Sequence, residues 1–218
     1  MTRMSSGTLQ RISGIAGILG GLTLFAGDML FYFSTQSDNV TLNMAHSADW
    51  RITASAFTAL IATWLYLFGL YNVYYAFRPA TAKARWTVVL TFGALLVNFG
   101  IVHAQYVAIA TSAKLALQNG LDIMQSAAFA RHINDLLRLP GYLFFAVLSV
   151  VFLVNVWKGK TLYKKIMVLF FPLIPYLFLF VLKPALHGTA YVVVIGGYLN
   201  LLLVIFFTAS TVMLWNKE

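Results

Sequence analysis

Long apolar runs separated by short polar segments dominate the sequence. Six runs have the roughly 17 to 25 residues that a helix needs to cross a bilayer, or more, and they cover residues 12–33, 52–77, 86–113, 139–157, 166–182 and 189–215. Polar and apolar residues do not alternate in them as in membrane β-strands. The pattern predicts an all-α integral membrane protein, residues 1–218 forming one polytopic domain with a bundle of six transmembrane helices.

The longest connection, residues 114–138, carries a further helical pattern. Asn119-Gly120 predicts the end of the third membrane helix, and apolar positions recur over residues 121–138. This segment predicts a short helix on the extracytoplasmic membrane surface. Pro140 follows it at a position where the first turn of the fourth membrane helix tolerates proline.

Two of the apolar runs contain residues that disturb helices. Pro172 and Pro175 lie in the fifth run, and the pair Gly196-Gly197 lies in the sixth. Proline removes a backbone donor and glycine loosens the helix. The sequence therefore predicts a kink in the fifth helix and a weak point in the sixth.

Basic residues are distributed unequally over the connections. Ten of the 15 fall on the side that also holds both chain ends, at Arg3, Arg11, Arg78, Lys83, Arg85, Lys158, Lys160, Lys164, Lys165 and Lys217. The positive-inside rule then predicts that both termini are cytoplasmic. The net charge of +9 belongs to this rim, where we expect contact with anionic lipid rather than with nucleic acid.

Composition removes several classes of protein. Hydrophobic residues make up 61% and charged residues 10% of the chain, whereas globular proteins average about 45–50% and 25%. Cysteine is absent, which excludes disulfides, thiol catalysis and Cys-based metal sites. With its compact loops, this composition predicts a multi-pass protein of a bacterial inner membrane whose chemistry lies within the bundle or at its rim.

Asp28 is the candidate residue with the clearest physical basis. A carboxylate inside a membrane helix costs roughly 2.5 to 3.5 kcal/mol, so it ordinarily faces protein or water and has a partner. Tyr32 follows it by one helical turn, and His103 lies at a similar depth in the third run. Arg51 directly precedes the second run, where it could neutralise Asp28. These positions predict a polar site in the extracytoplasmic half of the bundle.

Two groups of residues are assigned to this predicted site. The catalytic candidates, which would also be the ligands if a metal such as zinc is bound, are Asp28, His103 and His187. The ligand-binding candidates are Arg51, Tyr32, Asn98, Gln105 and Arg138. The spacing of known zinc motifs is absent, so metal ligands would have to come from separate helices.

Three functions fit this pattern. The first is binding or chemical processing of a lipid or hydrophobic small molecule in a water-accessible cavity. The second is a transporter or channel in which Asp28 and His103 relay protons or cations. The third is a structural or partner-binding membrane subunit. We favour the first, because the histidines and most acidic residues cluster in the extracytoplasmic half, as a water-accessible cavity there would explain. The sequence has no convincing internal repeat of the kind common in alternating-access transporters, which counts against the second.

Overall fold

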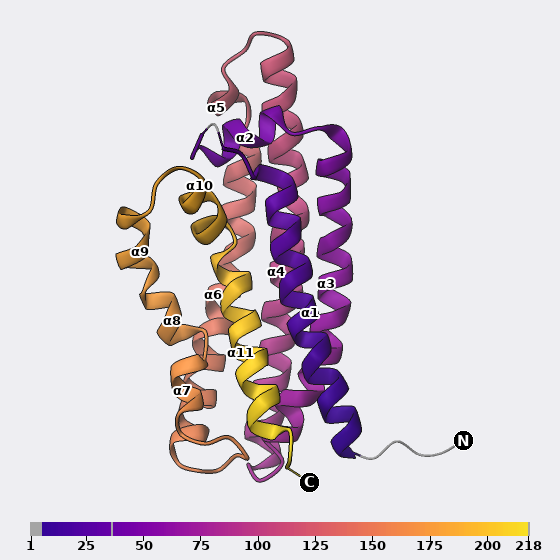
Figure 1. Ribbon diagram of the computed structural model, residues 1–218, viewed down its shortest axis with the longest axis vertical. Coiled ribbons are helices and arrows are strands. Elements are labelled where there is room, and N and C mark those ends of the chain that lie inside the picture. Colours follow the sequence, from indigo (N-terminus) through magenta and orange to yellow (C-terminus); the bar gives the residue numbers. More distant parts are fainter. Residues whose placement is uncertain (1–5, 36, 218) are drawn as a thin grey trace, which may run out of the picture.

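The structure is a computed structural model that describes residues 6–35 and 37–217. Every regular element within these residues is helical, which confirms the all-α prediction. The long helices of the bundle are α1 (Ser6–Tyr32), α3 (Asp49–Ala76), α4 (Ala82–Gln118), α6 (Ala128–Trp157) and α11 (Tyr198–Leu214) (Figure 1). Arg3, which entered the orientation argument, lies outside the described residues.

Shorter helices connect and cover the bundle. They are α2 (Val40–His46), α5 (Ile123–Ser126), α7 (Met167–Phe170), α8 (Leu173–Leu177), α9 (Leu179–Ala185), α10 (Gly188–Ala190) and the π-helix η1 (Tyr191–Ile195). Figure 1 shows α2 and α5 at one end of the bundle and the start of α1 and the end of α11 at the other. We call these the α2 end and the terminal end.

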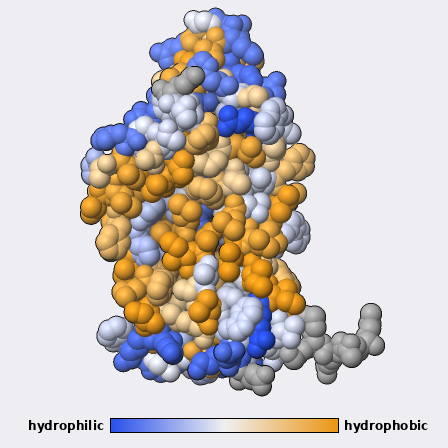
Figure 2. All heavy atoms as spheres, viewed as in Figure 1, coloured by the Kyte–Doolittle hydropathy of each residue, from blue (hydrophilic) through white to orange (hydrophobic). Residues whose placement is uncertain are grey.

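Four helices, α1, α3, α4 and α6, are long and apolar enough to cross a membrane. The bent pair formed by residues 188–195 and α11 makes a fifth span if it is counted as one. Figure 2 shows a broad apolar belt between two polar ends. The prediction of a multi-pass helical membrane protein is therefore confirmed. Residues 166–182, the fifth predicted span, are divided among α7, α8 and α9, so the count of six spans stays a prediction. The orientation of the termini also stays a prediction.

The segment expected as a separate surface helix has a different arrangement. Only α5 stands alone, and α6 begins at Ala128 and continues through Pro140 to Trp157. Two side-chain bonds hold the first turns of α6 along α4, because Asn134 donates to the Val102 carbonyl and Asn98 to the Leu137 carbonyl, each at 2.8 Å. Residues 128–138 therefore extend a bundle helix.

Close helix packing is made possible by small residues. α1 lies along α3 and α11, while α4 lies along α3 and α6. A methyl group added to Gly69 of α3 would stand 2.8 Å from the Gly17 Cα of α1, so the two helices meet there backbone to backbone.

Aromatic side chains fill the terminal half of the bundle. Phe152 of α6 stacks on Phe171 with their ring centres 4.4 Å apart, and it meets Phe206 of α11 at 5.7 Å. Phe92 of α4 completes this layer, 5.4 Å from Phe206. All four rings are fully buried, so the bundle is closed toward the terminal end.

The segment from α7 to η1 is irregular, with a helix break before α8 and a bend before α11. Residues 188–195 are bent by 53° from α11, and Gly196 and Gly197 lie at the bend, as their pairing predicts. Pro172 follows the end of α7 and precedes α8, which confirms the predicted disturbance there. The α2 half of the bundle is thereby opened between α1, α4, α6 and α11.

Candidate functional site

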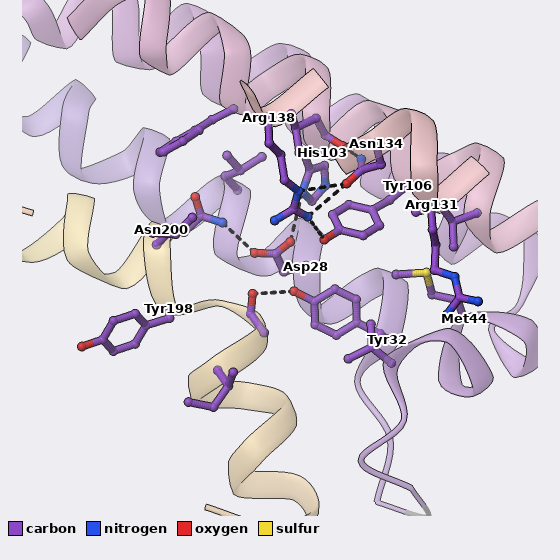
Figure 3. Close-up of a pocket in the computed structure, with 18 of the residues that line it drawn as sticks. Asp28, Tyr32, Met44, His103, Tyr106, Arg131, Asn134, Arg138, Tyr198 and Asn200 are labelled. Carbon is purple, nitrogen blue, oxygen red and sulfur yellow. Dashed lines mark hydrogen bonds and ion pairs between the residues drawn. The ribbon is translucent and has the colours of Figure 1, made fainter. Parts of the chain in front are cut away.

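A cavity of about 500 Å³ occupies this opening. Asp28 and Tyr32 of α1, His103 of α4, Arg138 of α6 and Asn200 of α11 contribute to its wall. In Figure 3 these side chains converge on one space, and the Arg138 guanidinium points into it beside Asp28. The predicted site residues Asp28, Tyr32, His103 and Arg138 are therefore brought together.

Asp28 is buried, with 5% of its surface exposed, and both carboxylate oxygens are bonded. Its Oδ1 lies 3.1 Å from His103 Nδ1, and its Oδ2 accepts a hydrogen bond of 2.6 Å from Asn200 Nδ2. A carboxylate has about four acceptor positions, so further capacity remains toward the cavity. The partners of Asp28 are thus a histidine and an amide.

Arg51 does not pair with Asp28. Its guanidinium donates to the carbonyls of Met29 and Phe33 at 2.9 and 3.2 Å, where it caps the end of α1. The free carbonyls of a helix C-terminus attract a cation, which explains this placement. Arg51 therefore stabilises the helix that carries Asp28 without lining the cavity.

His103 is held on all sides. Its ring lies 5.1 Å from the Phe31 ring and 6.2 Å from the Tyr106 ring, and its Nε2 lies 3.0 Å from Ser55 Oγ. A methyl group on Gly27 would stand 2.9 Å from Nε2, so glycine is needed for this approach. The imidazole is therefore fixed between Asp28 and a serine.

The order Ser55, His103, Asp28 matches the connectivity of a serine-hydrolase triad. However, Ser55 is fully buried and is not part of the cavity wall. Its hydroxyl also lies 2.7 Å from the Gly27 carbonyl. A substrate in the cavity therefore has no access to the Ser55 oxygen.

Arg138 is fixed along one edge of its guanidinium. Nη2 donates to the Tyr106 hydroxyl at 2.6 Å, and Nε and Nη2 donate to Asn134 Oδ1 at 3.1 and 3.0 Å. Asp135 is 3.9 Å from Nε, with most of its own side chain exposed. Nη1 makes no hydrogen bond to the described residues. The guanidinium is thus oriented by protein through Nε and Nη2, and the two hydrogens on Nη1 remain for a ligand.

A second, apolar cavity of about 130 Å³ adjoins the first. The two share part of their walls, namely Phe99, Val102, Arg138, Tyr176 and Leu199. The smaller cavity extends toward the aromatic layer at Phe92. Arg138 consequently lies where a polar chamber joins an apolar one.

The remaining predicted site residues lie elsewhere. Asn98 lines the apolar cavity and donates to the Leu137 carbonyl. Gln105 is outside both cavity walls, and His187 is exposed beside the start of α10. Within residues 6–35 and 37–217 there is no group of three or more His, Cys, Asp or Glu that could hold a metal ion. The set Asp28, His103 and His187 is accordingly not assembled.

Several site residues were missed by reasoning from the sequence. Tyr106 follows His103 by one turn and Asn134 precedes Arg138 by one turn, so helical spacing could have indicated both. Ser55 and Asn200 come from other helices. Only the packing of α3 and α11 against α1 brings them to the site.

The fold and the cavity define a class, a multi-pass helical membrane protein with a buried polar centre at one end of its bundle. Residues 4–217 match DUF6796, which is described as a family of unknown function, and the chain belongs to this family. Comparisons with curated proteins and with solved structures gave no match.

Proposed function

We propose that the protein binds a lipid-like molecule with an anionic head group, placing the head in the larger cavity and the chain in the smaller one. The observation that carries this proposal is the junction at Arg138, where both cavities meet. Ligand sites commonly combine an apolar lining with a few convergent polar groups. An amphipathic molecule fits both chambers, whereas a small polar ligand would leave the apolar one unused.

The charges around the larger cavity favour an anionic head group. Arg131, Arg138 and Lys183 line it, against the carboxylates Asp28 and Asp135. Asp28 already has His103 and Asn200 as partners, and Asp135 lies at the exposed rim. The guanidinium of Arg138 is suited to carboxylate, sulfonate or phosphate oxygens, because the two hydrogens on Nη1 are left to donate charge-assisted bonds.

Binding is favoured over conduction because a layer of buried aromatic rings lies between the cavity and the terminal end. The rings of Tyr66, Phe92, Phe206 and Phe207 are fully buried and pack on one another. A transporter would have to open this layer, and a channel would need a polar path through it. Binding is also favoured over nucleophilic hydrolysis, because Ser55 lies outside the cavity wall.

We also propose an orientation of the protein in the membrane. The α2 end would face the extracytoplasmic side, as the distribution of basic residues predicts, and the anionic ligand would enter from that leaflet. The basic residues of the terminal end would contact anionic lipid on the cytoplasmic side. Labelling of single cysteines introduced at Lys160 and Asp122, with a reagent that does not cross membranes, tests this orientation in cells.

Ligand binding is tested with the protein in lipid nanodiscs, with decanesulfonate as the anionic probe and decanol as its uncharged counterpart. The wild type should bind decanesulfonate more tightly than decanol, and Arg138→Met should weaken sulfonate binding about 10- to 100-fold, because a hydrogen bond to a charged group is worth about 1.5 to 3 kcal/mol. Arg138→Lys should retain part of the affinity. Lys114→Gln is the control, because Lys114 bonds to Asp49 at the α2 end but does not line the cavity. Equal binding of both probes, or an unchanged Arg138→Met, would refute the proposal.

A further inference from the structure

The hydroxyl of Ser55 lies between two acceptors. Its oxygen is 2.7 Å from the Gly27 carbonyl oxygen and 3.0 Å from His103 Nε2. A serine hydroxyl has a single proton to donate. It can therefore donate to Gly27 or to His103, but not to both, and the choice determines where protons lie in the rest of the chain of bonds.

In the first arrangement Ser55 donates to His103 Nε2. Nδ1 then carries the ring proton and donates to Asp28, which is a carboxylate, so the pair has a net charge of −1. In the second arrangement Ser55 donates to the Gly27 carbonyl. Nε2 must then carry a proton to bond to Ser55, and one further proton must lie between Nδ1 and Asp28. The second arrangement holds one more proton, and the pair is neutral overall.

We infer that Asp28 and His103 form a proton-binding site, and that the anionic ligand binds together with one proton taken up by this pair. The inference rests on the proposed function. Asp28, His103 and Ser55 are at most 5% exposed, so water does little to screen their charge. A ligand anion beside Arg138 would meet a negative pair in the first arrangement and a neutral pair in the second. Like charges disfavour each other at short range, so ligand binding favours the protonated arrangement.

Other charged and titratable groups face this site from every neighbouring element. They are Tyr32 on α1, Tyr66 on α3, Tyr106 on α4, Arg131, Asp135 and Arg138 on α6, Tyr176 on α8, Lys183 on α9, Tyr191 on η1 and Tyr198 on α11. A guanidinium keeps its proton in proteins, and phenols keep theirs near neutral pH. Asp135 and Lys183 lie at the exposed rim. Among the described residues that face this site, the Asp28–His103 pair is the buried group whose two hydrogen-bonding arrangements differ by one proton.

Asp28→Asn separates proton uptake from ligand binding. The amide oxygen can accept from Asn200, and the amide nitrogen can donate to His103 Nδ1. Nε2 then donates to Ser55, and Ser55 donates to the Gly27 carbonyl, so every bond of the protonated arrangement is kept. The variant is thus a neutral replica of the proton-loaded site and is expected to fold.

The experiment measures decanesulfonate affinity from pH 6 to pH 9 in nanodiscs, together with proton uptake in weakly buffered solution and empty nanodiscs as the blank. The sulfonate keeps its charge throughout, so protons taken up belong to the protein. In the wild type we expect affinity to fall with rising pH, by up to about tenfold per pH unit for one linked proton, and uptake to approach one proton per bound ligand. Asp28→Asn should bind at least as tightly, with a flat pH dependence and no uptake.

Three results would overturn the inference or locate its failure. Wild-type binding without pH dependence or uptake refutes proton coupling and leaves the proposed function intact, as does uptake that persists in Asp28→Asn. Absence of binding at any pH refutes the proposed function instead. In that case the ¹⁵N signals of His103 still test the proton site, because they should titrate in the wild type and remain those of a neutral ring with its proton on Nε2 in Asp28→Asn.

Discussion

The contact between Gly17 and Gly69 leads to a prediction for the Gly69→Ala variant. The added methyl carbon would lie 2.8 Å from the Gly17 Cα and 3.0 Å from the Gly17 nitrogen, whereas carbon atoms in good contact are about 3.5 to 4.0 Å apart. The obstacle is backbone, which cannot rotate away as a side chain can. α1 and α3 must therefore separate by about 0.7 to 1.2 Å at this point.

The free energy of this change can be approximated. A gap of about 0.5 to 1 Å removes a quarter to a half of the dispersion energy between facing atoms, and overpacking costs about 1 to 3 kcal/mol. Alanine recovers up to about 1 kcal/mol, because it favours the helix more than glycine does. We expect a net destabilisation of about 1 to 2 kcal/mol, visible as a lower midpoint for unfolding by heat or by sodium dodecyl sulfate in mild detergent.

Gly93→Ala is the matched control for this measurement. Its methyl group would meet only the ends of side chains, 3.2 Å from Leu70 Cδ1 and 3.8 Å from Leu67 Cδ2, and these can move. Its stability should therefore remain close to that of the wild type. If both variants lose the same stability, or if Gly69→Ala loses none, the backbone contact of α1 and α3 does not limit the packing.

Three further variants test other parts of the structure. Asn200→Leu should reduce stability by about 1 to 3 kcal/mol, because Asp28 Oδ2 loses its donor inside the protein, and chemical denaturation would detect this; an unchanged protein would mean that water replaces the amide. Tyr66→Phe should be neutral or stabilising in the same assay, because the buried Tyr66 hydroxyl has no partner among the described residues. Tyr163→Phe should cost about 1 kcal/mol at neutral pH through loss of the 2.6 Å bond to Ser210. Burial raises the pKa of Tyr163, so wild-type stability should fall above about pH 10, as the unfolded phenol ionises first, and this part of the fall should be absent in Tyr163→Phe.

The helical membrane bundle could be predicted from the sequence, because apolar runs of this length have few other stable structures. The division of residues 166–182 into α7, α8 and α9 could not be derived in the same way. Pro172 and Pro175 indicated a kink, but local preference does not determine whether a kinked segment remains one helix. The continuation of α6 through Pro140 depends on α4, because the Val102 carbonyl of α4 accepts a hydrogen bond from Asn134.

The site could be predicted where the cost of burying a polar side chain can be read from the apolar residues next to it in the sequence. Asp28 and His103 stand out because a charged or titratable side chain in an apolar helix needs a partner, and they are indeed partners. By its charge, Arg51 was the expected partner of Asp28, but its guanidinium donates instead to backbone carbonyls at the end of α1. Ser55 carries no such signal, because a serine in a membrane helix can bond within its own helix. The role of Ser55 in the site is evident only from the 3.0 Å distance between its Oγ and Nε2 of His103 on α4.

The bend before α11 explains why the polar site and the cavity occur together. At the bend the π-helix η1 and the pair Gly196-Gly197 interrupt the regular helix, and the Gly196 carbonyl accepts a 2.7 Å bond from Tyr32. The next turn presents Asn200 to Asp28. If α11 continued straight, residues 191–195 would follow its axis along α1, and the space that the 53° bend opens would not exist. The same irregularity that exposes a carbonyl for Tyr32 thus gives Asp28 its amide partner and makes room for a ligand beside it, consistent with the frequent occurrence of π-helical turns at functional sites.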